Sequence, residues 1–552
     1  MLAVLWQWLA LLWRCFWSWV RSRSEWVWSR SEWVHTRVTS RGPHRLDSDI
    51  TQEEELNYSQ SEEWKTDQSA RTYGYHDGAT MVAVQTSTHI FYVDLERLAE
   101  CGEYFRALSQ SSMVETSERR ILLDHVPSEV FHSLLQFCLL GVFSVSRPRL
   151  PSHLQVSSYL LSSAYTARLL ARLSALLTPL TCPAHLELSE RLGCPELRHQ
   201  VLLYLSAHLL ELPHLSRALE PHERQLLPGL RSAGRTPRLC CLLKENLSAR
   251  NVPETLAARQ VYCLEEEEEE GVEGRGWREL TEMPFEADKW CFTTAVLFNY
   301  LYVIGGYRHR VARGYEFKMA SFRYNPLTQQ WATVAPMMKH RRHFSAVACE
   351  GCVYAVGGWY LDSLVTPDSS TSLYTAVERY DPWADRWAFV SSLPLSDFSF
   401  TLSLAHDSPL TVALGGCLYV LGNIQRTGEK LVLRYSITDD CWSELMPTLT
   451  RADAHISSLY FLGATEKLLV IGGNNTETVV TSFCVDSQCW GRVQSMERTA
   501  LIGQGTVLDG EAFVWSLRHG AVMRLNLDSL SFSLLPTLPL PSCYESLFHL
   551  CF

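Results

Sequence analysis

Short apolar runs alternate with polar turns throughout the second half of the chain. The two clearest runs are YVIGG at residues 302–306 and YAVGG at residues 354–358. β-Branched and aromatic residues in such short runs predict strands buried on both faces, and the paired glycines let the chain leave each strand with unusual φ angles. A tyrosine and then a tryptophan follow each run, as in Tyr380 and Trp387. The pattern therefore predicts a repeating β-sheet unit.

The unit recurs at a regular interval. Tryptophans come about every 50 residues, a period that fits a four-stranded blade of a β-propeller, and they are Trp277, Trp331, Trp387, Trp442 and Trp490. Weaker copies stand near Tyr262 and at residues 512–515. One blade cannot bury its own faces, so the blades must close into a ring. We therefore expect an all-β propeller over residues 258–552, with residues 547–552 as the closing strand.

Ahead of the repeat, the apolar positions change to helical spacing. Residues 131–141 form an apolar helical face that ends in Gly141, a typical helix stop. Residues 160–164 fit the next helix. A further series has the same spacing and consists of Leu192, Leu197, Val201, Leu205 and Leu209. The first half of the chain is therefore expected to be rich in helix.

Three segments carry a resemblance to known modules. The repeat, with double glycine, tyrosine and tryptophan in phase, resembles the Kelch repeat. Residues 90–145, with the triplet Met-Val-Glu at 113–115, resemble the core of a BTB domain. Residues 182–197, with Cys182 and Cys194 at the spacing that family shows, resemble the start of a BACK domain. In this order the three modules resemble the Kelch-like family.

The resemblance implies an α+β multidomain chain with four parts. Residues 1–69 form an extension and residues 70–178 an α/β BTB-like domain. Residues 179–257 form a short all-α BACK-like segment, and residues 258–552 an all-β six-bladed Kelch propeller. The second half of a full BACK domain is not apparent, so the arm that joins the two ends is expected to be shorter than usual.

The resemblance also implies a function. Members of the Kelch-like family typically bind the cullin-three scaffold through BTB and BACK, and they hold a protein client on the propeller for ubiquitination. The residues implied for cullin binding are Met113, Glu115, Cys182 and Cys194. The residues implied for client binding are Arg341, Arg451 and Arg498, because arginine can hold carboxylates with two hydrogen bonds. The alternatives are a Met113 packed in the domain core and arginines that tie neighbouring blades together.

Two departures from the family bear on this interpretation. Asp94 and Leu95 stand where the family has a histidine and a basic residue that meets its partner across a homodimer, so dimerisation is left open. A Kelch scaffold without a ligase, cytoskeletal or membrane-associated, is the competing hypothesis. The tryptophan-rich start of the chain is interrupted by Gln7 and Arg14, which argues against a membrane span. An extension without fixed structure is favoured there over a helix on a membrane surface.

Charge and cysteine content bear on the functional class and on the cellular compartment of the protein. The net charge of −11 over 552 residues lacks the basic footprint of a nucleic-acid binder. The 17 cysteines are scattered, which fits a reducing compartment and favours a cytoplasmic protein. The acidic run at residues 265–270 is expected to be a solvated blade loop, with contact to a basic client as the alternative.

Motifs for chemistry are absent from the sequence. It has no nucleophile elbow, phosphate loop or zinc-protease helix, so no enzyme, cofactor or catalytic residue is predicted. Cys349 and Cys352, with His340 and His343 nearby, invite a zinc interpretation. Glu350 and its following glycine instead predict a hairpin turn between the two cysteines, so no metal site is expected.

Overall fold

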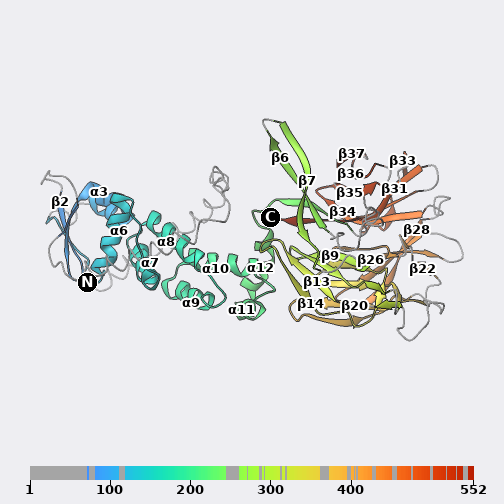
Figure 1. The fold of residues 1–552 in the computed structure, drawn as a ribbon, viewed down its shortest axis with the longest axis horizontal. Helices are drawn as coiled ribbons and strands as arrows, with labels where there is room; N and C mark the ends of the chain where they lie inside the picture. The colour runs from blue at the N-terminus through green and yellow to red at the C-terminus, as the bar shows by residue number, and fades with distance from the viewer. Residues whose placement is uncertain are drawn as a thin grey trace. The chain divides into compact units, whose positions relative to one another are not determined.

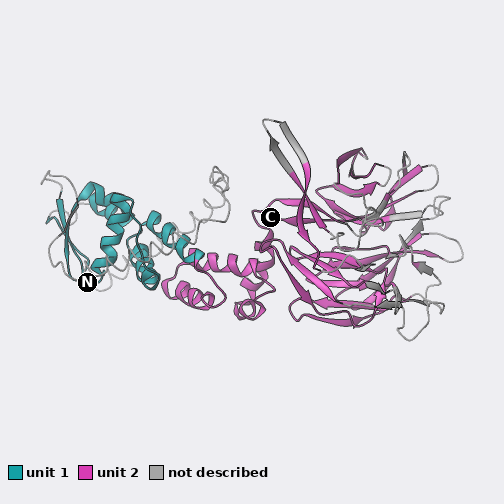
Figure 2. Cartoon of the chain, viewed as in Figure 1, with its two compact units in different colours: residues 1–175 teal, residues 176–552 magenta. Residues whose placement is uncertain are grey.

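A computed structural model gives the fold, and it divides the chain into two compact units, residues 1–175 and 176–552 (Figure 2). Each unit is described by itself. The described residues are 71–73, 81–110, 118–243 and, between 260 and 552, all except 270–271, 285–288, 291, 311–313, 317–319, 361–371, 395–399, 403, 406–407, 425–429, 450–456, 474–476, 498–500, 517–518, 530 and 539–544. The predicted N-terminal extension, residues 1–69, lies outside them.

The first unit is built on a four-stranded sheet. Its strands are β1 (Arg71–Tyr73), β2 (Met81–Gln85), β3 (Ile90–Asp94) and β4 (Arg120–Leu122), in the order β1-β3-β2-β4. Side chains alternate between the two faces of a strand, so one face is buried and the other is open. The buried face carries Val82, Val84, Phe91, Val93 and Ile121.

Helices complete the first unit. They are α3 (Leu95–Glu100), α4 (Glu103–Gln110), α6 (Ser128–Leu140), the 3₁₀ turn η1 (Arg147–Arg149), α7 (Leu150–Tyr159) and α8 (Ser163–Ala175). The predicted stop of α6 is confirmed, because Gly141 adopts a left-handed φ of 71°. The helix expected over residues 160–164 is wrong. A turn over 160–162 separates α7 from α8, and Leu161 has a positive φ of 52°.

The second unit begins with four helices, α9 (Cys182–Leu192), α10 (Pro195–Ala207), α11 (Pro213–Ala218) and α12 (Pro221–Ser232). Each has a proline in its first turn, where the missing N–H costs nothing. The predicted helical series is divided at Gly193, whose left-handed φ of 57° ends α9. Figure 1 shows α10 and α12 leading into the strands of the propeller.

The rest of the unit is a ring of β-sheet blades (Figure 1), and the last two of its six blades are joined in one eight-stranded sheet. The innermost strands are β9 (Thr293–Leu297), β16 (Ser345–Cys349), β25 (Thr411–Leu414), β29 (Ser457–Ala464), β34 (Leu501–Leu508) and β38 (Glu545–Cys551). Each contacts the next, and β38 contacts β9, so the ring is closed. The predicted six-bladed propeller is confirmed.

Five blades follow the chain outward from the channel, and we number them 1 to 5. They continue with β10 (Tyr300–Ile304), β13 (Ser321–Asn325) and β14 (Gln330–Val334); β17 (Cys352–Val356), β20 (Val377–Asp381) and β21 (Arg386–Val390); β26 (Cys417–Ile424), β27 (Lys430–Ser436) and β28 (Cys441–Leu449); β30 (Lys467–Gly473), β31 (Glu477–Cys484) and β32 (Cys489–Trp490); and β35 (Glu511–Ser516), β36 (Ala521–Asn526) and β37 (Phe532–Thr537).

Shorter strands lie between and beside these. They are β8 (Lys289–Trp290), β11 (Tyr307–Arg310), β12 (Gly314–Glu316), β15 (Arg341–Arg342), β18 (Trp359–Tyr360), β19 (Ser372–Leu373), β22 (Phe400–Leu402), β23 (Leu404–Ala405), β24 (Ser408–Pro409) and β33 (Gln494–Glu497).

Blade 6 is assembled from both ends of the propeller. Its order is β38, β5 (Pro237–Leu243), β6 (Gln260–Glu269) and β7 (Val272–Glu282), so the C-terminal tail supplies the innermost strand as expected. The propeller was expected to begin at residue 258, but β5 already belongs to it. The first five acids of the run 265–270 lie in β6 rather than in a loop, and Glu265 pairs with Arg238 on β5.

The repeated tryptophans join neighbouring blades. The indole N–H donates to the blade before it: from Trp387 to the Ala335 carbonyl at 2.9 Å, and from Trp442 to the Ser391 carbonyl at 2.9 Å. Trp277 likewise donates to a blade 5 carbonyl at 2.8 Å, which closes the series across the ring. The repeat in the sequence is therefore a repeat of inter-blade contacts.

Candidate functional site

The helices and the propeller of the second unit meet at a buried arginine. Arg231, near the end of α12, has a fully buried side chain. It donates to the carbonyls of Ser206 and Ala207 at 2.6 and 2.9 Å, where α10 ends. A cation at a helix C-terminus is stabilised by the carbonyls left unpaired there.

The same guanidinium reaches the propeller. It donates to the carbonyls of Phe298 and Asn299 at 2.6 and 3.2 Å, and to Asn325 Oδ1 at 2.9 Å. Phe298 and Asn299 form the β9–β10 turn, and their positive φ angles of 52° and 54° fit a tight hairpin. The guanidinium carbon lies 3.7 Å from the centroid of the Tyr300 ring. Arg231 therefore joins α10, α12 and blade 1.

A second contact lies beside the first. The Tyr300 hydroxyl donates to Glu211 at 2.7 Å, and Arg323 donates to the Leu210 carbonyl at 3.1 Å. Burial raises the pKa of Tyr300 well above its usual range, so its phenol is neutral and can donate. Farther along the helices, Arg217 on α11 donates to the Trp383 carbonyl of blade 2. The helical segment is thus held to blade 1 by buried and partly buried polar contacts and to blade 2 by an exposed one.

The junction also touches the strand that closes the ring. The side-chain amide of Asn299 donates to the Cys551 carbonyl and accepts from the Cys551 N–H, both at 2.8 Å. One turn therefore contacts Arg231 through its carbonyls and β38 through a side chain. The sequence did not indicate this junction, because a lone arginine and a lone asparagine form no motif.

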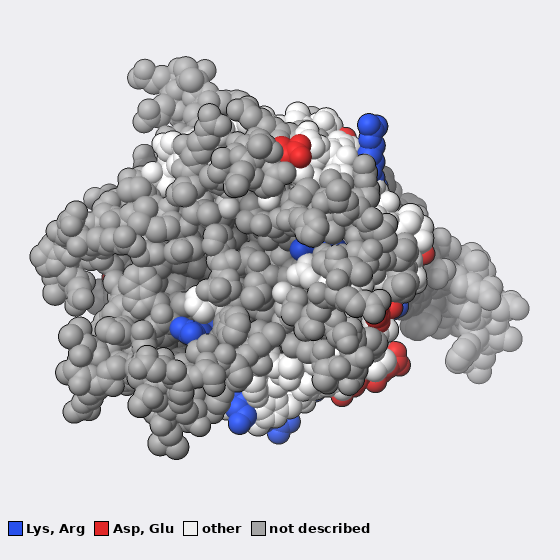
Figure 3. Space-filling view, turned by 90° about the vertical axis from the view of Figure 1, so that its right-hand side faces the viewer, with Lys and Arg blue, Asp and Glu red and all other residues white. Residues whose placement is uncertain are grey.

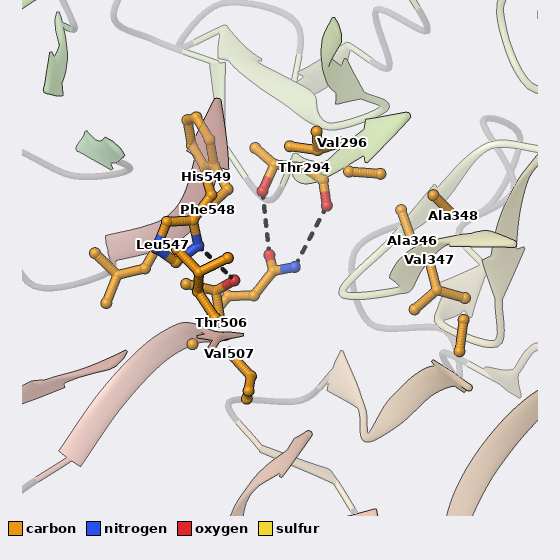
Figure 4. Close-up of a pocket in the computed structure, with 15 residues that line it drawn as sticks. Thr294, Val296, Ala346, Val347, Ala348, Thr506, Val507, Leu547, Phe548 and His549 are labelled. Carbon is orange, nitrogen blue, oxygen red and sulfur yellow. Dashed lines mark hydrogen bonds between the residues drawn. The ribbon is translucent and has the colours of Figure 1, made fainter. Parts of the chain in front are cut away.

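A cavity of about 330 Å³ lies in the channel of the propeller (Figure 4). Its wall is formed by the innermost strands β9, β16, β25, β34 and β38. Gln504 exchanges two hydrogen bonds with Thr294, and Thr506 faces His549 at 3.4 Å. Burial lowers the pKa of His549 to about 4, so this imidazole is neutral at pH 7. The polar groups of the channel satisfy one another and hold the inner strands together.

In the first unit, aromatic and apolar side chains gather where α4 meets the α7–α8 turn. The backbone N–H groups of Glu103 and Tyr104 donate to the carbonyls of Leu161 and Leu160 at 3.2 and 3.4 Å. The Tyr159 ring packs on Tyr104 and edge-on against His125, with centroids 5.8 and 4.7 Å away. Tyr159 and Leu161 remain 47% and 56% exposed. We name Tyr104, His125, Tyr159 and Leu161 the α4 patch; the sequence analysis missed it.

Among the residues expected to bind a client, Arg341 does not fit that role. Its side chain is buried inside blade 2 and pairs with Glu378 at 2.5 Å, both fully enclosed. It also donates to the carbonyls of Gly357 and Ala376 at 2.9 and 2.8 Å. The alternative weighed from the sequence, an arginine that ties parts of the propeller together, describes it. Arg451 and Arg498 lie outside the described residues.

Of the four residues expected to bind cullin, two lie outside the described residues and two are buried. Met113 and Glu115 lie outside the described residues, just after α4. Cys182 and Cys194 are buried, at the start of α9 and immediately before α10. Burial raises the pKa of Cys182 to about 11, as for a thiol in an apolar core. Both side chains are thus buried within the helical segment, which argues against direct contact with a partner and corrects the expectation.

The described residues were also compared with the expectations for a metal site, a charged surface and a membrane span. The side chains of Cys349 and Cys352 flank a hairpin turn across β16 and β17, as predicted, and no metal-binding cluster occurs among the described residues. On the face of the propeller shown in Figure 3, the charges that can be described are scattered and form no single-sign patch. No helix in the described part of the chain is long and apolar enough to cross a membrane.

Comparison with known proteins agrees with the fold. The BTB/POZ domain model matches residues 79–169, and the Kelch motif model matches residues 340–394. The chain is 30% identical over 264 residues to Kelch domain-containing protein 7A of Mus musculus, which covers 47% of this chain and 29% of that protein. It is 27% identical over 365 residues to Kelch repeat and BTB domain-containing protein 13 of Homo sapiens, covering 66% and 71%. It is 27% identical over 199 residues to Kelch-like protein 36 of Bos taurus, covering 36% and 29%.

A BTB sheet-and-helix unit, followed by helices fixed to a closed Kelch propeller, defines a class of proteins built from protein-binding modules. The chain is a divergent member of the BTB-Kelch family.

Proposed function

We propose that the chain is a substrate-recognition adaptor of a cullin-three RING ubiquitin ligase, acting in the cytoplasm. The first unit binds the cullin and the propeller holds a protein client. The adaptor needs no chemistry of its own, because it works by raising the local concentration of client lysines near the conjugating enzyme.

The observation that carries this proposal is the junction at Arg231. An adaptor must transmit the position of its bound client to the rest of the ligase. The buried contacts of Arg231 and Tyr300 make the helices and the propeller one compact unit. A client on the propeller is therefore carried at a fixed place relative to α9–α12, which supports the proximity mechanism.

The cullin is proposed to bind at the α4 patch together with Met113 and Glu115. An interface core is typically built of aromatic and apolar anchors surrounded by polar residues. The exposed Tyr159 and Leu161 offer such anchors, and Met113 follows the end of α4 by three positions. For the client, Arg451 and Arg498 remain the proposed contacts.

The test is titration calorimetry of the full-length chain with the amino-terminal region of cullin-three. We expect micromolar or tighter binding, weakened at least about tenfold by Tyr159→Ala and by the double change Met113→Ala, Glu115→Ala. The matched control is Leu122→Ala, because Leu122 is 56% exposed on the open face of the sheet in the same unit. A folded wild-type chain that gives no binding would overturn the proposal.

A Kelch scaffold without a ligase is the second candidate. Asp94, which stands where the family has a histidine, is used locally: its carboxylate accepts from the backbone N–H groups of Glu96 and Arg97 at 2.9 and 3.2 Å and so caps α3. Leu95 stands where the family has the basic residue that meets its partner across a homodimer, and the loss of that residue motivates the scaffold candidate. Proteasome inhibition separates the two candidates: if client abundance rises under inhibition only when this chain is present, the scaffold is excluded.

A further inference from the structure

Two cysteines face each other across the outer turn of blade 4. Cys484 is the last residue of β31, Cys489 is the first residue of β32, and the two are direct partners in the antiparallel register. Directly opposed residues have Cβ atoms about 4.5–5.5 Å apart. A disulfide needs Cα atoms about 4.4–6.8 Å apart and Cβ atoms about 3.5–4.5 Å apart. The backbone therefore brings the two thiols within a small adjustment of bonding.

The turn also exposes one of the two cysteines. Cys489 is exposed and Cys484 is half-buried, whereas most other cysteines among the described residues are buried or half-buried. The opposed pair Cys240 and Cys263, across β5 and β6, is buried, so it has the same register without the access. Cys441 is exposed, but serine stands opposite it in the register. The opposed pair Cys349 and Cys352 is buried on one side and half-buried on the other. Among the described residues, only the blade 4 turn therefore pairs an exposed cysteine with a directly opposed thiol.

Ser487 interacts with both cysteines. Its hydroxyl is 2.9 Å from the sulfur of Cys489. Hydrogen bonds from the hydroxyl and the backbone N–H of Ser487 lower the pKa of Cys484, which favours its thiolate. The thiolate is the nucleophile in reactions of cysteine with peroxides. One residue of the turn thus contacts both thiols, and it favours Cys484 as the attacking group.

We propose that Cys484 and Cys489 form an oxidation site that responds to peroxides. The Cys484 thiolate attacks one peroxide oxygen, a sulfur–oxygen bond forms, the oxygen–oxygen bond breaks, and hydroxide leaves. Cys489 then attacks the sulfenic sulfur of Cys484, a disulfide forms, and the hydroxyl leaves as water with the proton of the second thiol. With hydrogen peroxide, the hydroxide takes up the proton that the Cys484 thiol released, so two thiols are oxidised to one disulfide and the peroxide is reduced to two molecules of water.

The two cysteines flank a turn that, in blades 2 and 3, contacts the preceding blade. In blades 2 and 3 the turn carries Asp385 or Asp440, whose carboxylate accepts a backbone N–H of the preceding blade at 2.9 Å. In blade 4 Gln488 occupies this position. Next to the cysteines, the rings of Phe483 and Trp490 pack 5.2 Å apart. A disulfide would fix a turn that lacks the aspartate of blades 2 and 3, beside the aromatic pair that fills this blade.

The full-length chain suits a direct test, because one tryptic peptide, residues 468–492, contains Cys484 and Cys489 and no other cysteine. The reduced, folded chain is treated with hydrogen peroxide, quenched by alkylation, digested and analysed by mass spectrometry. We expect the peptide to lose two hydrogen atoms on the order of ten times faster than Cys441, in peptide 435–451, becomes oxidised. Cys240 and Cys263 should stay reduced while the chain is folded.

Three variants complete the test. Cys489→Ser should trap Cys484 as a sulfenic acid that reacts with a 1,3-dione probe, and Cys484→Ser should abolish the internal disulfide. Ser487→Ala should slow the reaction severalfold without changing the melting temperature, because all three residues lie at a surface turn. The proposal is overturned if Cys484 and Cys489 react no faster than Cys441, if they link to other cysteines, or if both proceed to sulfinic acid without a disulfide.

Discussion

Replacing Arg231 by methionine tests the junction on which the adaptor proposal rests. The guanidinium donates to four backbone carbonyls and to Asn325 Oδ1, and its side chain is fully buried. Burial lowers the pKa of Arg231, but an arginine keeps its charge at pH 7. Hydrogen bonds to a charged group contribute about 1.5–3 kcal/mol each, and they are not additive within one network. Methionine fills much of the volume and leaves the acceptors unpaired, so we expect a loss of about 3–5 kcal/mol.

The assay is hydrogen exchange of the full-length chain. Amides of α10, α12 and the β9–β10 turn should lose protection in Arg231→Met, while those of β2 and β3 in the first unit should not change. Arg235→Ala is the matched control: Arg235 follows α12 and donates to two carbonyls of that helix, at 3.0 and 3.1 Å, so its loss should cost below about 1 kcal/mol. Unchanged protection in Arg231→Met would refute the junction as the device that holds helices and propeller together.

Three further predictions concern stability. Gly102→Ala should destabilise the first unit by about 2–3 kcal/mol in chemical denaturation, because a Cβ there would lie 2.4 Å from a backbone carbonyl oxygen; Gly229→Ala, with open space around it in a helix, should be neutral or stabilising. His153 is neutral when folded, since burial lowers its pKa to about 4, so protonation of the unfolded chain should lower stability by about 2 kcal/mol from pH 7 to 5, and His153→Gln should reduce that slope. Trp387→Phe should cost about 1–2 kcal/mol and lower the melting temperature, because it leaves the Ala335 carbonyl unpaired.

The propeller could be predicted from the sequence because its signals are local and repeated. Gly305 and Gly357 adopt positive φ angles of 68° and 65°, as their double-glycine motifs indicate. A Cβ at Gly357 would lie 2.8 Å from a proline side chain of blade 3, so the motif also records a close approach between blades. Each repeat reflects the same requirement, which is close packing of one blade on the next, and six imperfect copies together predict one ring.

Other parts of the molecule could not be predicted, because their partners are distant in the sequence. Strand β5 has the apolar character of a helix face, and only its pairing with β38, about 300 residues away, makes it a strand. Arg341 stands at the end of a blade, where a solvent-facing arginine and an enclosed one are indistinguishable in sequence; the carboxylate of Glu378 decides between them. Periodicity reports which face is buried and leaves open what covers it.

The turn between β9 and β10 also contacts the strand that closes the ring. Asn299 pairs with both backbone groups of Cys551 on the closing strand, and the carbonyl of Asn299 accepts from Arg231. The helices that precede the propeller therefore contact the turn that holds its last strand. The folded helices α9–α12 should favour the closed ring. Bringing β38 back to the start of the propeller costs entropy, and the contacts of Asn299 with Arg231 and Cys551 offset part of that cost. Helices α9–α12 and the propeller are consequently expected to unfold together. In Asn299→Ala, the backbone amides of β38 should exchange hydrogen faster than those of blade 1.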